Sequence, residues 1–321
     1  MRAETGGLIV GVDGSAQADL ALDWALREAA RRDTTLVAVY SWVQSWDDGT
    51  RGVHPDGAEE VFAAKQTYVQ SLLDAAVQRS RDAGHVVGDP DRVTARQVHG
   101  WPAEVLLELG KELDVEMVVV GRSGLGRFGR FLLGSVSSSV VQHAHVPVTV
   151  VAHEGADVPP PETHGAGGDG PDDGTGPADE RPRVVVGVDG SDLSIGALRE
   201  GAAAAERLDG VLQPVYCWQL TTISPMPEAW GWIPPIDDYD QWARTKLLET
   251  VADAHLDLPA DRVRPVVVHA PPSPGLLGVA EGAERLVVGA RGLGGFERLV
   301  LGSVSRQVLE AAPCPVTVVR A

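Results

Sequence analysis

Short apolar runs alternate with longer segments whose apolar residues recur at helical spacing through the first half of the chain. The run from Leu8 to Val12 is unbroken, which is typical of a strand buried on both faces of a parallel sheet. The pattern predicts strands over 8–12, 35–42, 93–99, 115–120 and 146–151, and helices over about 16–32, 59–83, 103–113 and 135–144. Strands that alternate with helices indicate βαβ units in a parallel sheet with right-handed crossovers.

The second half of the chain repeats this order. Asp13 and Asp189 each follow the first strand of their half, and Tyr40 and Tyr216 occupy matching places in the second strand. Such internal repetition indicates a diverged duplication. Between the halves, residues 153–182 are rich in Pro, Gly, Asp and Glu, which predicts a flexible acidic linker. We therefore expect domains over 1–152 and 183–321, each an α/β fold with a doubly wound, five-stranded parallel sheet.

Composition narrows the classes of function. The net charge of −18 argues against nucleic acid as a partner, since duplex binding needs a basic face. No apolar run approaches the roughly 20 residues that span a bilayer. Residues 1–7 lack the basic patch and apolar core of a secretory signal. We expect a cytoplasmic protein with no membrane partner, in which Cys217 and Cys314 are buried thiols rather than a disulfide.

Glycines follow the fourth predicted strand of each half at one spacing, G-x2-G-x9-G-S. The first copy consists of Gly121, Gly124, Gly134 and Ser135, and the second of Gly289, Gly292, Gly302 and Ser303. Glycine lets main-chain N–H groups approach an anion without a Cβ in the way, and the next helix adds its own N-terminal N–H groups. Ser135 and Ser303 can each cap that helix or donate a hydroxyl to an oxygen. The repeated spacing favours phosphate binding over a simple turn.

This pattern resembles the ATP-binding signature of the universal stress protein family. The resemblance extends to the strand starts Val-Gly-Val-Asp-Gly-Ser at 10–15 and 186–191, and to the strand ends at 146–151 and 314–319. It covers nearly the whole chain apart from the linker. It implies one ATP in each domain, with the glycines and serines of both copies along the triphosphate and ribose. Val136 and Val304 would add main-chain contacts.

The resemblance also implies roles at the first and second strands. Gly11 and Gly187 would leave room for a flat base or a ribose. Main chain near the end of the second strand would bracket adenine, which points to Ser41 and Cys217. These two pairs hold matching places in the two halves.

The remaining assignments keep an alternative. Asp13 and Asp189 would contact the nucleotide or its Mg²⁺, the alternative being that each caps its own turn. Arg130 and Arg298 hold equivalent places between the glycines, as phosphate ligands or as solvated surface arginines.

Other motifs are set aside. Residues 124–129 fit the dinucleotide fingerprint G-x-G-x-x-G, but the second copy ends in Glu297 and no acidic residue follows at the required distance. His143 and His145 resemble a metal pair, yet Ala311 and Pro313 replace them in the second half. No set of nucleophile and base is recognisable.

We expect a tandem universal stress protein that acts as an ATP-dependent regulator of the stress response. The resemblance also implies that the closing strands of the two domains pair, giving a pseudo-dimer, with a homo-dimer of whole chains and a regulatory protein as further partners. Two alternatives remain open. The chain is an ATP-consuming enzyme, a slow ATPase or a nucleotidyl transferase, or it is an interaction scaffold without a ligand.

Overall fold

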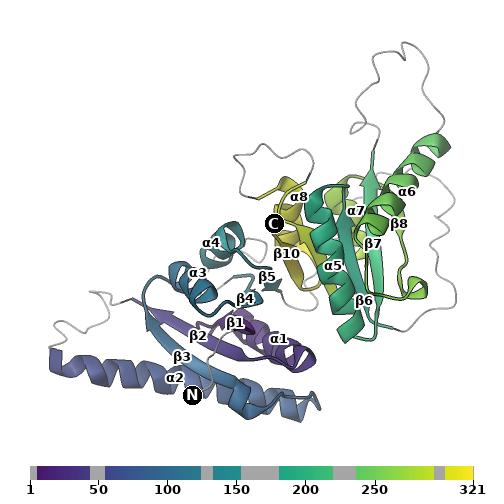
Figure 1. The fold of residues 1–321 in the computed structure, drawn as a ribbon. Helices are drawn as coiled ribbons and strands as arrows, with labels where there is room; N and C mark the ends of the chain where they lie inside the picture. Colours follow the sequence, from purple (N-terminus) through teal and green to yellow (C-terminus); the bar gives the residue numbers. More distant parts are fainter. Residues whose placement is uncertain are drawn as a thin grey trace. The chain divides into compact units, whose positions relative to one another are not determined.

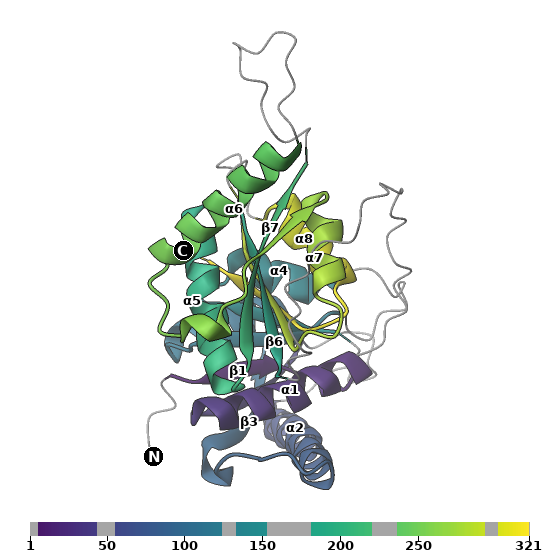
Figure 2. The same cartoon turned by 90° about the vertical axis from the view of Figure 1, so that its right-hand side faces the viewer.

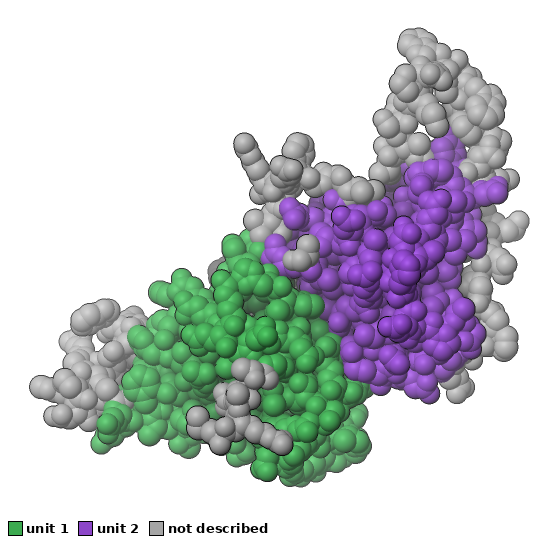
Figure 3. Space-filling model, in the orientation of Figure 1, with its two compact units in different colours: residues 1–153 green, residues 154–321 purple. Residues whose placement is uncertain are grey.

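A computed structural model describes residues 6–43, 55–123, 133–152, 181–219, 236–292 and 301–320. The chain divides into two compact units, Met1–His153 and Glu154–Ala321, which Figure 3 colours green and purple. Most of the expected linker, 153–180, lies outside the described residues. The expected pairing between the closing strands of the two halves stays a prediction, and each unit is described by itself.

The first unit alternates strands and helices as the apolar pattern predicts. Its strands are β1 (Leu8–Gly11), β2 (Leu36–Trp42), β3 (Val93–His99), β4 (Met117–Gly121) and β5 (Val148–Val151). Its helices are α1 (Ala16–Arg32), α2 (Pro55–Asp82), α3 (Pro102–Glu112) and α4 (Ser135–His143), with a short 3-10 turn at Pro90–Arg92. Strand β5 begins two residues later than expected, because Pro147 has no N–H to donate to a neighbouring strand.

The strands of this unit form a parallel sheet in the order β3-β2-β1-β4-β5. Leu8 of β1 is paired with Leu36 of β2 on one side and with Met117 of β4 on the other. Helices α1 and α2 cover one face of the sheet, and α3 and α4 cover the other (Figure 1). The chain runs from β1 outward to β3 and then returns to place β4 on the other side of β1. The strand order therefore reverses between β1 and β4. This doubly wound order confirms the predicted fold class.

The second unit repeats this architecture. Its strands are β6 (Arg183–Val188), β7 (Val211–Trp218), β8 (Val266–His269), β9 (Arg285–Gly289) and β10 (Val316–Val319). Its helices are α5 (Asp192–Arg207), α6 (Ile236–Asp253), α7 (Pro272–Val279) and α8 (Ser303–Ala311), with a 3-10 turn at Ala260–Arg262. The parallel order is β8-β7-β6-β9-β10, with α5 and α6 on one face and α7 and α8 on the other (Figure 2).

Local sequence explains where the helices begin and end. Ser15 and Ser191 are the N-caps of α1 and α5, and the side chain of each accepts a hydrogen bond from a main-chain N–H in the first turn. Helices α3 and α7 carry proline in the first turn, where a missing N–H costs nothing. Asp33 ends α1 in the left-handed conformation, with φ of 50°, a conformation that Asp tolerates better than most residues.

The cores consist of valine-rich strands and small residues on the helices. Leu8, Ile9 and Val10 of β1 are at most 1% exposed. On one face of the first sheet, Leu22 of α1 and Leu73 of α2 belong to the same buried cluster as Leu8 and Val10. Burial of each such side chain stabilises the fold by about 1.5–3 kcal/mol. No helix within the described ranges is long and apolar enough to cross a bilayer.

Both cysteines are free thiols, in agreement with expectation. Cys314 is buried, and Cys217 is half-buried. A Cβ at Gly275 would stand 2.7 Å from the sulfur of Cys217. Burial raises the pKa of each thiol to about 12. Neither sulfur is therefore ionised near neutral pH.

One pair of glycines tests the packing of the helices of the second unit. A Cβ at Gly201 of α5 would clash with Val186 and would lie 3.0 Å from Leu212, whereas a Cβ at Gly278 of α7 would meet nothing within 4 Å. We expect Gly201→Ala to lower the free energy of unfolding by about 1–3 kcal/mol. Gly278→Ala should leave it unchanged or raise it by up to about 1 kcal/mol. Urea unfolding measures both, and equal effects would contradict the packing.

The thiol environment gives a second prediction. Because the pKa of each cysteine is about 12, the folded protein at pH 8 holds almost no thiolate, which is the species that reacts with iodoacetamide. We expect slow alkylation of the folded protein and fast double alkylation after denaturation, followed by mass spectrometry. Labelling of the folded protein as fast as that of free cysteine would show that the sulfurs are accessible.

Candidate functional site

A cavity of about 500 Å³ lies at the carboxyl ends of β1, β2 and β4 in the first unit. In open parallel sheets, ligands bind at the carboxyl edge where the strand order reverses, which here is the gap between β1 and β4. The volume is within the range of small-molecule pockets. The lining residues are Gly11, Val12, Asp13, Ser15, Ala18, Val39, Ser41, Pro102, Leu106, Val120, Gly121, Ser123, Leu133, Gly134, Ser135, Val136 and Ser137.

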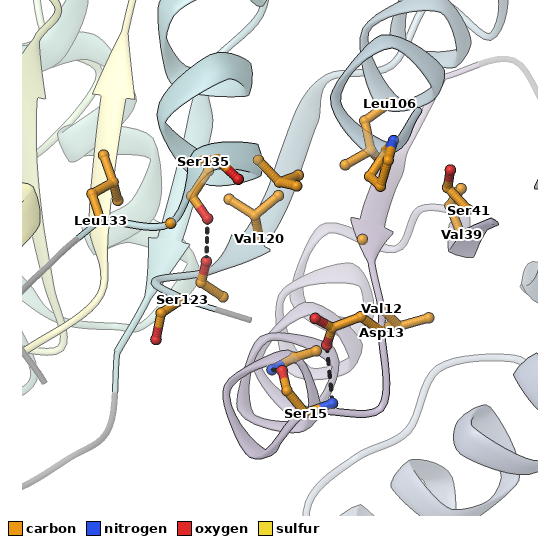
Figure 4. Close-up of a pocket in the computed structure, with 17 residues that line it drawn as sticks. Val12, Asp13, Ser15, Val39, Ser41, Leu106, Val120, Ser123, Leu133 and Ser135 are labelled. Atoms are coloured by element: carbon orange, nitrogen blue, oxygen red, sulfur yellow. Dashed lines mark hydrogen bonds between the residues drawn. The ribbon is translucent and has the colours of Figure 1, made fainter. Parts of the chain in front are cut away.

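Seven of the predicted site residues of the first half line this cavity. They are Gly11, Asp13, Ser41, Gly121, Gly134, Ser135 and Val136. In Figure 4, Asp13 and Ser15 lie at the start of α1, across the cavity from Ser123 and Ser135. Gly124 and Arg130 of the first half, and Arg298 of the second, lie outside the described residues.

The turn after β1 presents the carboxylate of Asp13. The Oδ1 atom of Asp13 accepts a hydrogen bond from the N–H of Ser15 at 2.9 Å, and Ser15 Oγ accepts from the N–H of Ala18 at 3.2 Å. Gly14 makes the turn with φ of 78°, and the hydroxyl of Tyr68 lies against it. Burial, with Tyr40, Asp13 and Asp19 nearby, raises the pKa of Tyr68. Asp13 therefore has an ordered main chain and a second carboxylate oxygen, Oδ2, that bonds to no described residue.

Helix α4 starts at the opposite side of the cavity. Its N-cap is Gly134, whose N–H donates to Arg122 O at 2.8 Å and whose carbonyl accepts from Ser138 N at 2.8 Å. The capping role considered for Ser135 is therefore wrong, because this serine is the first helical residue. The N–H groups of Ser135, Val136 and Ser137 have no carbonyl to bond within the helix. Three main-chain donors at the positive end of a helix consequently belong to residues that line the cavity.

A buried serine fastens this helix to the sheet. Ser137 is 4% exposed and donates its hydroxyl to the carbonyl of Gly121 at 2.6 Å. Ser305 and Gly289 make the same bond, also at 2.6 Å, between α8 and β9 of the second unit. Neither serine was among the residues predicted to act, although both belong to a Gly-Ser-Val-Ser segment that occurs in each half.

The glycines of the strands are required by packing. A Cβ at Gly121 would stand 2.7 Å from the carbonyl oxygen of Gln17, so the first turn of α1 approaches β4 more closely than any side chain allows. A Cβ at Gly289 would likewise stand 2.9 Å from the Cβ of Leu193 in α5. Gly11 was expected to leave room for a base or ribose, but a Cβ there would meet Leu106 of α3 at 2.9 Å. Leu106, which sequence analysis did not single out, fills that space and forms an apolar wall.

The second unit places its predicted residues at the corresponding positions. The N–H of Gly302, the N-cap of α8, donates to Ala290 O at 2.7 Å, so that the helix begins with Ser303 and Val304. Ser303 is therefore not the cap that was considered. A Cβ at Gly187 would stand 3.0 Å from a side-chain carbon of Leu276, just as one at Gly11 would meet Leu106. The start of α8 and the packing of the strand glycine thus repeat those of the first unit.

Two matched positions differ in chemistry. Ser41 donates its hydroxyl to the carbonyl of Gly100 at 2.5 Å, and lines the cavity. Its counterpart Cys217 points its sulfur toward Gly275 of α7. Asp189, the counterpart of Asp13, has one carboxylate oxygen against Gly292.

The described residues contain no group of three or more His, Cys, Asp or Glu side chains that could hold a metal by themselves.

Comparison with known proteins agrees with this architecture. The model of the universal stress protein family matches residues 7–152 and 180–320. A universal stress protein of Mycolicibacterium smegmatis is 31% identical over 331 residues, which cover 98% of this chain and 97% of the relative. One from Mycobacterium tuberculosis is 32% identical over 330 residues, with coverage of 98% and 95%.

A solved structure shows the same fold. The crystal structure of a universal stress protein from Archaeoglobus fulgidus covers 100% of this chain and 99% of its own, with a TM-score of 0.61 and 18% identity. The family match thus falls once in each compact unit and the sequence relatives span nearly the full length. The chain belongs to the universal stress protein family.

Proposed function

We propose that each unit binds ATP and that the chain acts as a nucleotide-dependent regulator of the stress response. The observation that carries the proposal is the cluster of main-chain N–H groups at Ser135, Val136 and Ser137, which opens into a cavity at the reversal point of the sheet. Helix N-termini of this kind bind phosphate, since oriented N–H groups and the helix dipole both favour negative charge. The triphosphate would lie on this side.

The opposite wall suits a nucleoside. Val39, Leu106 and Val120 give the cavity apolar surface for a flat base, and Ser41 contributes a polar group at the end of β2. Asp13 would accept a hydrogen bond from a ribose hydroxyl through Oδ2, or would hold the hydration shell of Mg²⁺. The metal would take its other ligands from phosphate oxygens, as is usual for nucleotide-bound Mg²⁺. ATP carries in one molecule the phosphates for the start of α4 and the nucleoside for the opposite wall.

The residues that line the cavity suit a regulatory nucleotide-binding site better than a catalytic site. Asp13 is the sole side chain among the described lining residues that is charged at neutral pH, and none of them forms a nucleophile–base pair. Phosphoryl transfer needs a positioned nucleophile, and the described lining presents none with a base beside it. An ATP-consuming enzyme is the second candidate, and steady release of ADP or pyrophosphate would favour it.

We propose that the protein acts in the cytoplasm, where ATP is available. Its partner would be a regulatory protein, which the nucleotide site does not identify.

The purified chain gives a direct test. Mass spectrometry of the small molecules released on denaturation should find adenine nucleotide, at up to two per chain. Calorimetric titration with ATP and Mg²⁺ of the emptied protein should give a measurable heat and raise the melting temperature. A flat titration with an unchanged melting temperature would favour the ligand-free scaffold.

A charge placed at the start of α4 tests the phosphate site itself. Ser135 is exposed at the first helical position, where a carboxylate stabilises a helix. We expect Ser135→Asp to fold normally and to weaken ATP binding in the first unit by at least about a hundredfold, because the carboxylate repels phosphate. Calorimetry should report the loss of one of the two sites.

The control is Ser135→Asn, which has the same shape without the charge and should retain both sites. Ser303→Asp should remove the second site in the same way, since Ser303 is also exposed at the first position of its helix. Unchanged binding of ATP by Ser135→Asp would place the phosphates elsewhere.

A further inference from the structure

The two aspartates that follow the first strand of each unit hold matching positions but are bound differently by their own chain. In the first unit, the carboxylate of Asp13 accepts one hydrogen bond from the described residues, from the N–H of Ser15 at 2.9 Å. The hydroxyl of Ser15 accepts a hydrogen bond from the first turn of α1, and no bond from it to Asp13 is found among the described residues. With respect to these residues, most of the hydrogen-bonding capacity of the Asp13 carboxylate is therefore unused.

Asp189 of the second unit is held by a local network. Its Oδ1 atom accepts from the N–H of Ser191 at 3.0 Å, from Ser191 Oγ at 2.7 Å and from Ser194 Oγ at 2.6 Å. The main-chain N–H of Asp189 also donates to Ser194 Oγ at 3.0 Å, so this hydroxyl bonds both ends of the aspartate. The other oxygen, Oδ2, lies against Gly292 of the glycine loop.

One side chain accounts for much of the difference. Ser194 lies in the first turn of α5 and is 3% exposed, and the matching residue in α1 is Ala18, which is 5% exposed. A buried hydroxyl must bond to something nearby, and at position 194 it bonds to Asp189. The methyl side chain of Ala18 has no polar atom and cannot hydrogen-bond to Asp13. The sequence difference is a single oxygen atom.

We propose that Ser194 weakens the second nucleotide site by holding the Asp189 carboxylate, so that the two units bind nucleotide with unequal affinity. The proposal rests on the function proposed above. Three charge-assisted hydrogen bonds to Oδ1 fix the orientation of the Asp189 carboxylate and draw off part of its negative charge, so its Oδ2 is a weaker acceptor for a ribose hydroxyl or hydrated Mg²⁺ than Oδ2 of Asp13. Ser194 is therefore a positioning residue that acts through Asp189, and the first unit is the tighter site.

The two sites can be measured one at a time in the full chain. Ser303→Asp leaves the first site to be titrated, and Ser135→Asp leaves the second. With ATP and Mg²⁺ in the calorimeter, we expect the first site to bind roughly tenfold more tightly than the second, the factor that corresponds to one weakened hydrogen bond to a charged group. Equal affinities, or a tighter second site, would overturn the proposal.

Exchange of the single differing atom tests the cause. In the Ser135→Asp background, Ser194→Ala should tighten the second site roughly tenfold, and in the Ser303→Asp background, Ala18→Ser should weaken the first by a similar factor. The gain from Ser194→Ala should vanish when Asp189→Asn is added, because the effect passes through the carboxylate. A gain that persists in the variant that also carries Asp189→Asn would refute the mechanism.

The outcomes separate this proposal from the proposed function. If neither unit binds ATP, the function is wrong and the inference falls with it. If both bind equally and neither exchange changes the affinity, the function stands and the inference alone is wrong. Circular dichroism checks that each variant folds, and Ala18→Ser in the first unit still decides the case if Ser194→Ala does not fold.

Discussion

The close approach of a helix to the end of a strand determines the rest of each site. In the first unit, the first turn of α1 lies so near β4 that only glycine fits at position 121. That contact brings the turn carrying Asp13 and the end of β4 to one edge of the sheet. The Ser137 hydroxyl, bonded to the carbonyl of the same Gly121, then fixes the start of α4 beside them. One residue without a side chain thus joins the two walls of the cavity.

The fold could be predicted from the sequence in nearly all respects. Apolar runs located the strands to within about two residues, because a buried parallel strand cannot tolerate polar side chains on either face. The glycine spacing likewise pointed to the edge of the sheet where the cavity lies. The sequence did not reveal packing partners, however. Gly11 was expected to make space for a base or ribose and does line the cavity, but Leu106 stands where its Cβ would be, since only three-dimensional packing reveals which neighbour occupies a vacant Cβ position.

Hydrogen bonds of buried hydroxyl groups were the least predictable part. Ser137, Ser194 and Ser305 look alike in sequence, but two of them fasten a helix to a strand and the third binds a carboxylate. A serine in the first turn of a helix has several acceptors within reach, and tertiary structure decides among them. This is why the repeat, which is so regular in its glycines, did not reveal the difference between Asp13 and Asp189.

The hydrogen bond between Ser137 and Gly121 joins two groups of the protein itself, so it orients the main-chain donors at the start of α4. The rate at which a nucleotide reached these donors would depend on diffusion and on the electric field of the whole molecule. With a net charge of −18, that field repels an anion at long range. Added salt shortens the reach of the repulsion, so the association rate of an anionic nucleotide would rise with ionic strength.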